Sequence, residues 1–256
     1  MRLLADPEAA RKFLRRDLAL WAWPLCTLGP REWPFVRLWV DDPRRLKAGL
    51  WVFDHPSWGG SVQAFGPETT LQEMLPSVRL PGRAFVRMLP PARALLTGRF
   101  RFDWLEPIVR MHVTPETLIE PPQMHLAVSL GQLDAQALAT LYAVWPESRF
   151  QPSRLRMGYQ YMGIRERGRL VAVAEHVLTA RDDGIAVVQG VLVDPACRGR
   201  GLAAAVTAAL TRKLFEDGAR DVVLDVRESN VPALAAYARI GYRQHVTMLA
   251  GPGSSR

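Results

Sequence analysis

Two arginines and two glycines alternate at residues 198–201, between an apolar run and an alanine-rich segment. The run at residues 185–193 is mostly β-branched, which predicts a buried strand that ends at Asp194-Pro195. Residues 201–217 are rich in Ala and Leu and precede Gly218, which predicts a helix. The turn therefore lies at a helix N-terminus, where backbone N–H groups lack partners and the helix dipole is positive. This setting suits a diphosphate group.

The residue types within the turn fit the same ligand. Gly199 and Gly201 have no Cβ atoms, so their backbone can approach phosphate oxygens closely. Arg198 and Arg200 can add charge-assisted hydrogen bonds. A Walker loop is excluded because no Gly-Lys-Ser/Thr follows, and the Rossmann fingerprint requires a different glycine spacing. A glycine-rich turn that only reverses the chain is the structural alternative.

Periodic segments surround the turn and predict an α/β domain. Residues 133–144 have helical spacing, and two strand-like runs, 159–165 and 169–178, are joined by a tight turn at residues 166–168. After the helix at 201–217, the expected elements are a strand at 221–226, a helix at 231–240 and a strand at 242–249. This order contains a βαβ unit around the turn.

Two motifs in this region resemble those of the GNAT acetyltransferase superfamily. Residues 191–203 resemble its acetyl-CoA motif, Gln/Arg-x-x-Gly-x-Gly/Ala, with Arg198, Gly201 and Ala203 at the defined positions. Residues 230–242 resemble its closing element, Asn-x-x-Ala-x-x-x-Tyr-x-x-x-Gly-Phe. The resemblance covers about half the chain and is closest to the glycine N-acyltransferase-like branch, in which an extra half precedes the acyltransferase domain.

The resemblance implies a domain organisation. Residues 125–250 are expected to form an α/β (α+β) GNAT fold, with a mixed, mostly antiparallel twisted sheet flanked by helices. Residues 1–120 are predicted to form a smaller α/β domain, and the resemblance allows a degenerate GNAT-like copy that forms one wall of the acceptor cleft or a homodimer interface. The boundary is the proline-bearing stretch 114–122, and residues 251–256 are predicted to be a flexible tail.

The resemblance also implies an activity. An acyl-CoA-dependent N-acyltransferase moves an acetyl or other short acyl group from coenzyme A to a primary amine of a small molecule, by direct attack in a ternary complex. A catalytically silent protein that binds acyl-CoA and regulates is the alternative. The residues assigned to acetyl-CoA or coenzyme A are Val191, Leu192, Val193, Arg198, Gly199, Arg200, Gly201, Leu202, Ala203, Asn230, Ala233 and Tyr237.

Two residues are the candidates for proton transfer. The family match assigns Tyr237 the role of general acid, and a half-buried aromatic residue is the structural alternative. Glu175 and His176 lie on one predicted edge strand and point to opposite faces, because strand side chains alternate. Glu175 is the predicted base, with a solvated glutamate and a water-relayed deprotonation as alternatives. In the family the strand before the turn bulges, and Gly190 would permit this.

The composition favours a soluble, globular protein of the cytoplasm. The net charge of +8 is scattered rather than clustered, so nucleic-acid binding is not expected. No apolar run approaches the roughly 18 residues of a membrane span, and the charged N-terminus is not a secretory signal. Two distant cysteines and isolated histidines predict no metal site.

Overall fold

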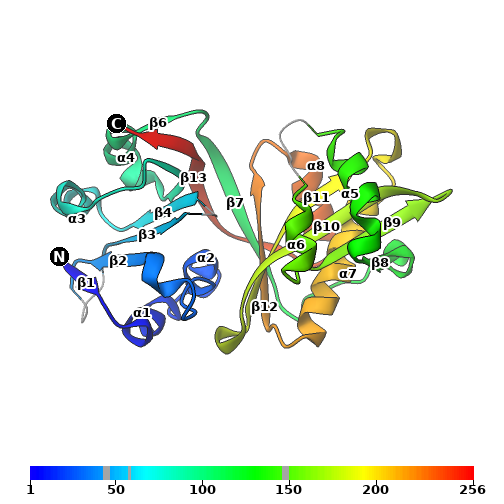
Figure 1. Cartoon of the computed structure of the whole chain (residues 1–256), viewed down its shortest axis with the longest axis horizontal. Helices are drawn as coiled ribbons and strands as arrows, with labels where there is room; N and C mark the ends of the chain where they lie inside the picture. Colours follow the sequence, from blue (N-terminus) through cyan, green and yellow to red (C-terminus); the bar gives the residue numbers. More distant parts are fainter. Residues whose placement is uncertain (43–46, 57–58, 146–149) are drawn as a thin grey trace. The chain divides into compact units, whose positions relative to one another are not determined.

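The computed structural model of the chain describes residues 1–42, 47–56, 59–145 and 150–256. These residues divide into two compact units (Figure 1). Unit 1 comprises residues 1–110, 227–229 and 246–256, and unit 2 comprises residues 111–226 and 230–245. The chain first passes from unit 1 to unit 2 after Arg110, slightly before the predicted boundary at 114–122.

Unit 1 is a sheet with four short helices. Its strands are β1 (Arg2–Leu4), β2 (Val36–Val40), β3 (Gly49–His55), β4 (Gly59–Phe65), β5 (Arg83–Met88), β6 (Phe100–Phe102) and the start of β7 (Glu106–Val113). Its helices are α1 (Pro7–Leu14), α2 (Ala22–Leu25), α3 (Glu68–Met74) and α4 (Arg93–Arg99). The strand order is β1-β2-β3-β4-β5-β13, where β13 (Arg243–Ser255) comes from the end of the sequence, and β6 also pairs with β13. A cluster of buried apolar side chains from β3, β4, β5, α3 and α4 forms the core.

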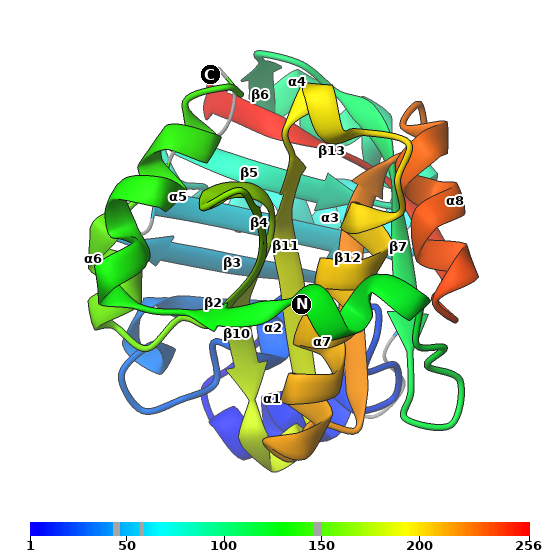
Figure 2. The same ribbon diagram turned by 90° about the vertical axis from the view of Figure 1, so that its right-hand side faces the viewer.

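Unit 2 contains the remaining strands of the same sheet and, among its described residues, four helices (Figure 2). Its strands are β8 (Val128–Leu130), β9 (Tyr161–Glu166), β10 (Arg169–Ala180), β11 (Ile185–Val193), β12 (Asp221–Arg227) and the start of β13 (Arg243–Ser255). Its helices are α5 (Ala135–Tyr142), α6 (Pro152–Arg156), α7 (Leu202–Glu216) and α8 (Val231–Arg239). The strand order is β7-β12-β11-β10-β9-β8, with β11 and β12 parallel and the strands from β8 to β11 antiparallel. This mixed sheet confirms the predicted fold class.

The two units repeat one order of elements and one pattern of pairing. In each, a strand, two helices and three antiparallel strands precede a helix that leads to a parallel strand, and a further helix and strand follow. The final strand of each series then joins the other unit: β7 pairs with β12, and β13 pairs with β5. The sequence showed no such repeat.

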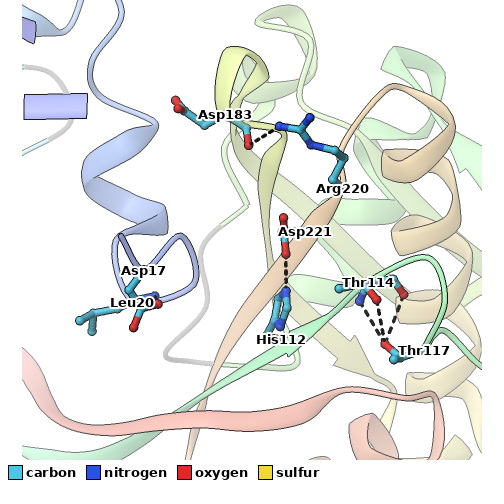
Figure 3. Close-up of polar contacts among 8 residues, drawn as sticks. All are labelled: Asp17, Leu20, His112, Thr114, Thr117, Asp183, Arg220 and Asp221. Atoms are coloured by element: carbon cyan, nitrogen blue, oxygen red, sulfur yellow. Dashed lines mark hydrogen bonds and ion pairs between the residues drawn. The ribbon is translucent and has the colours of Figure 1, made fainter. Parts of the chain in front are cut away.

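Most predicted elements are confirmed to within a few residues. In unit 1, residues 7–25 form two helices, α1 and α2, rather than one. The side chain of Asp17 accepts a hydrogen bond of 2.9 Å from the N–H of Leu20, which closes a turn between α1 and α2 (Figure 3). Local side-chain bonds of this kind compete with helical hydrogen bonds. The longest helix is α7, and among the described residues no helix has the length and hydropathy to cross a membrane.

The predicted flexible tail at residues 251–256 is wrong. Residues 249–254 of β13 pair with β5, and residues 253–255 pair with β6. The glycines that suggested disorder are required by close packing, because a Cβ atom on Gly251 would lie 1.9 Å from the carbonyl oxygen of Trp104. This end of the chain is therefore part of the sheet of unit 1.

The exchanged strands predict that neither half folds alone. A fragment of residues 1–120 lacks β13 and exposes the edge of β5, and a fragment of residues 125–256 lacks β7 and exposes the edge of β12. We expect the full chain to unfold cooperatively in urea, followed by circular dichroism, and each fragment to show no cooperative transition. A sharp transition in either fragment would contradict this assignment.

Candidate active site

The strand β11 carries a bulge at Gly190. Glu175 of β10 pairs with Gln189 and Val173 pairs with Leu192, so one residue of β10 lies opposite Gly190 and Val191. Gly190 has φ +59°, a left-handed conformation that residues with a Cβ atom rarely adopt. The predicted bulge is therefore present at the predicted glycine.

Beyond this bulge, β11 has no pairing partner on its other side. Pairing between β11 and β12 runs from Ile185 to Val188 and stops there, and both strands lie wholly within the described residues. Backbone N–H groups of residues 189–193 that face β12 therefore have no strand opposite them. These residues include Val191, Leu192 and Val193, which the sequence assigned to coenzyme A.

The opposite end of the β11–β12 pair is fixed by polar contacts (Figure 3). His112 Nε2 lies 2.6 Å from Asp221 Oδ1, which ties β7 to the first residue of β12. The guanidinium of Arg220 donates to the carbonyl oxygen of Asp183 at 3.3 Å, next to the start of β11. The two parallel strands are therefore held together where they begin and separate where they end.

The turn that follows β11 has an open backbone. Gly199 and Gly201 have φ +75° and +78°. Apart from the two chain neighbours of Gly199, no described residue has an atom within 4 Å of a Cβ position on it. Helix α7 begins at Leu202, and Ala205 is the first residue whose N–H donates back, to Gly201. The N–H groups of Leu202, Ala203 and the next residue thus have no partner within the helix. This combination fits a diphosphate group, as predicted.

The two arginines of the turn make different contacts. The Arg198 guanidinium lies 4.5 Å from the centre of the Trp145 ring, a cation–π contact. Arg200 donates two hydrogen bonds, of 2.6 and 3.0 Å, to the carboxylate of Glu166 at the β9–β10 hairpin. These hydrogen bonds raise the pKa of Arg200, which stays charged. Both guanidinium groups are thus oriented by neighbours, and both side chains remain largely exposed.

Glu175 is buried, which differs from the prediction. The strand β10 lies between β9 and β11 rather than at an edge, and Glu175 is 2% exposed. Its carboxylate accepts hydrogen bonds from Tyr142 at 3.1 Å, from Tyr161 at 2.8 Å and from Arg154 at 2.7 Å. Burial and the neighbouring carboxylate raise the pKa of both phenols, so both remain donors. This excludes the alternative of a solvated glutamate.

Sequence reasoning missed the three donors of this network. Arg154 comes from α6, Tyr142 from α5 and Tyr161 from β9, so the network exists only after these elements pack together. The alternation of side chains along paired strands could have placed Tyr161 beside Glu175, because the two residues are opposite each other in the β9–β10 register. His176, on the opposite face, contacts Thr179 at 2.7 Å, and burial lowers its pKa.

Tyr237 lies on α8 with its ring buried beside the ring of Tyr242, at 6.2 Å between centroids. Among the described residues, none hydrogen-bonds the hydroxyl of Tyr237. Burial raises its pKa, so the phenol keeps its proton at neutral pH. A protonated phenol without a protein partner is suited to donate a proton to a bound molecule.

Asn230 and Ala233 have a structural role at the start of α8. The side chain of Asn230 accepts a hydrogen bond of 3.3 Å from the N–H of Ala233, which caps the helix. This contact accounts for the Asn-x-x-Ala spacing without a ligand. The side-chain amide N–H groups of Asn230 can still donate to a ligand.

The comparison with known families decides the classification of this region. Residues 131–242 match the sequence profile of the acetyltransferase (GNAT) family. Residues 131–242 belong to the GNAT family. This GNAT domain contains β11, the glycine turn, α7 and α8, so the recognised motifs lie on the predicted elements.

Relatives of the GNAT domain are matched over short stretches or at low identity. A mycothiol acetyltransferase of Amycolatopsis mediterranei is 44% identical over 55 residues, which are 22% of this chain and 18% of that protein. The chain thus matches less than a fifth of the length of this relative.

Two solved structures share the fold of nearly the whole chain. A Drosophila protein has a TM-score of 0.69 at 17% identity, covering 99% of this chain and 97% of that one. A tandem GNAT protein from the clavulanic acid biosynthesis pathway has a TM-score of 0.53 at 15% identity, covering 99% and 98%. At these identities the likeness concerns the fold alone.

The bulge predicts a specific cost for a side chain at Gly190. A Cβ atom there would lie 2.8 Å from Glu175 Oε2 and 2.9 Å from the Tyr142 hydroxyl. We expect Gly190→Ala to lower the free energy of unfolding by about 2–4 kcal/mol, from left-handed strain plus overpacking. Gly158→Ala is the matched control, because Gly158 also has a positive φ but nothing within 4 Å. Urea denaturation should show that the control lowers the free energy of unfolding by about 1–2 kcal/mol. Equal losses in the two variants would contradict the close contact at Gly190.

Proposed function

We propose that the chain is an acyl-CoA-dependent N-acyltransferase that transfers an acetyl or other short acyl group to a primary amine of a small molecule. The observation that carries this proposal is the open end of β11 followed directly by the glycine turn of α7. Free N–H groups on the strand and at the helix start form two sets, separated by residues 194–198, whose N–H groups are bonded within unit 2 or absent at Pro195. A coenzyme A molecule has an extended arm and a diphosphate group that match these two sets.

Within this proposal, the turn holds the diphosphate. The N–H groups of residues 199–204 would donate to the phosphate oxygens, and Arg198 and Arg200 would neutralise their charge. Val191, Leu192 and Val193 would hold the pantetheine arm through the unpaired side of β11. Acetyl-CoA, when bound, supplies the acyl thioester that the amine attacks.

The chain's own groups supply positioning and one proton. Tyr237 would donate its phenolic proton to the departing thiolate, since burial keeps the phenol protonated. The sequence also predicted Glu175 as the base. Three donors already engage its carboxylate, so we propose that water takes the proton from the amine, one of the routes left open by the sequence. The larger part of the rate would then come from orientation.

We propose further that unit 1 is a degenerate copy of the same fold that binds no coenzyme A. It repeats the element order of unit 2, but Gly66 and Pro67 alone connect β4 to α3. The first residue of α3 is Glu68, whose charge would repel a phosphate. A Cβ atom on Gly66 would lie 2.5 Å from Ala48, so this turn packs closely against its own unit. Isothermal titration should therefore find one coenzyme A per chain.

The activity is tested by release of free thiol from acetyl-CoA in the presence of a panel of small amines. Turnover that saturates with one amine class supports the proposal. Saturable binding of coenzyme A without turnover on any amine would instead support the silent, regulatory alternative.

The turn predicts a graded loss of affinity for coenzyme A. We expect Arg198→Ala and Arg200→Ala each to weaken binding by about 10- to 100-fold, the equivalent of one charge-assisted hydrogen bond. Arg212→Ala removes the same charge from helix α7, away from the turn, where Arg212 pairs with exposed Glu120, and should change affinity by less than about 3-fold. Calorimetry with coenzyme A measures all three variants. Equal losses of affinity in all three variants would show that net charge, and not the position of the arginines in the turn, determines binding of coenzyme A.

Tyr237 predicts a loss of turnover with an intact fold. We expect Tyr237→Phe to lower kcat by about 10²-fold or more, because proton donation by a positioned group contributes this much. Tyr242→Phe is the control, since its hydroxyl lies 2.7 Å from Thr211 and has no role in transfer. It should lower stability by about 1 kcal/mol while kcat stays within about 2-fold. An unchanged kcat in Tyr237→Phe would remove the acid role.

A further inference from the structure

We propose that Glu175 is a positioning residue, not a base, and that its carboxylate locks the bulge of β11 through Arg154, Tyr142 and Tyr161. The expected effect of Glu175 on turnover rests on the proposed function. Its expected effect on the bulge of β11 rests on the structure alone. The reaction would depend on Glu175 because the unpaired N–H groups of β11 begin at the bulge that this carboxylate contacts.

The first step of the argument is where the carboxylate lies. Glu175 Oε2 and the Tyr142 hydroxyl lie against the position where any other residue at 190 would carry its Cβ atom. The space opened by the missing side chain of Gly190 is thus filled by polar atoms of the network. If the network moved away, an unfilled space would remain beneath the bulge, and the left-handed turn would lose the contacts that hold it.

The second step is how many elements one carboxylate joins. Tyr142 belongs to α5, Arg154 to α6 and Tyr161 to β9, and Glu175 itself is on β10. Helix α6 is a single short helix with no buried residue of its own, so its ion pair with buried Glu175 is an important attachment to the sheet. Removing one partner of a buried charge pair leaves an uncompensated charge, which makes the pair sensitive to any member.

The third step is chemical. A base must offer a lone pair to the proton that it removes. Glu175 Oε1 accepts from Tyr161 and Arg154, Oε2 accepts from Tyr142, and the side chain is 2% exposed. Arg154 is the member that reaches the surface, with a quarter of its side chain exposed. The network therefore meets solvent through a guanidinium, which cannot accept a proton.

The test compares variants that separate the two roles. Tyr161→Phe and Arg154→Met leave the Glu175 carboxylate chemically intact, whereas Glu175→Gln removes its charge. A base would tolerate the first two variants and lose activity only in Glu175→Gln, together with the acidic limb of the pH profile of kcat/KM. The positioning role predicts that all three lower kcat about 10- to 100-fold, with the shape of the pH profile retained. Glu216→Gln, at an exposed site on α7, is the control for loss of a carboxylate and should keep wild-type kcat.

A second readout does not need activity. Hydrogen exchange of the amides at residues 190–193 should become at least about 10-fold faster in Tyr161→Phe and Glu175→Gln, and exchange in the middle of α7 should stay unchanged. In the double variant Glu175→Gln/Tyr161→Phe, the amides at residues 190–193 should exchange no faster than in Glu175→Gln alone, because both substitutions act through one network.

The outcomes separate this inference from the proposed function. Wild-type rates of exchange and of turnover in Tyr161→Phe and Arg154→Met would overturn the positioning role, even if the enzyme acetylates amines. If the wild-type chain turns over no amine, the proposed function fails, and faster exchange at residues 190–193 in the variants still supports the role of Glu175 in holding the bulge.

Discussion

The left-handed backbone at Gly190 is the constraint on which the candidate site depends. This one residue adds a bulge to β11, and pairing with β12 ends two residues before it. A regular strand would have continued the ladder and paired the N–H groups that the proposed ligand needs. The same bulge creates the space into which Glu175 and Tyr142 project, so the open strand and the buried polar network have one common cause.

The polar network and the glycine turn differ in how their polar groups are satisfied. Before the bulge, a carboxylate is buried and must be fully satisfied, and two phenols and a guanidinium achieve this. After it, the first N–H groups of α7 have no partner within the helix, so solvent or an anion can satisfy them. Rigid support therefore lies directly behind an exposed, polar strand end, an arrangement suited to holding a ligand at a defined position.

The sequence predicted the elements that carry strong local signals. The strand Ile185–Val193, the glycine turn and helix α7 each have a pattern that one segment contains by itself, and all three are confirmed. The environment of Glu175 was not predictable in this way, because its three donors come from α5, α6 and β9. Glu175 is buried because β10 lies between β9 and β11, and this order of strands cannot be derived from a single sequence. The prediction of a flexible tail at residues 251–256 is wrong for a related reason. Its glycine-rich composition is a local signal, but the packing of Gly251 and Gly253 against Trp104 and Phe102 is tertiary.

The repeated topology gives a physical reason why one unit keeps a candidate site and the other does not. Both units have a strand, a connection and a helix at the equivalent place, but the connection in unit 2 spans residues 194–201, and in unit 1 it is Gly66-Pro67. A longer connection can raise its backbone away from the helix and supply arginines, whereas a two-residue connection is fully used in turning the chain. Unit 1 then contributes through its sheet, because its edge at β5 is covered by β13 from the far end of the sequence. The chain therefore ties its second half to its first by strand pairing, which is the reason to expect that the half without a phosphate turn supports the folding of the other half.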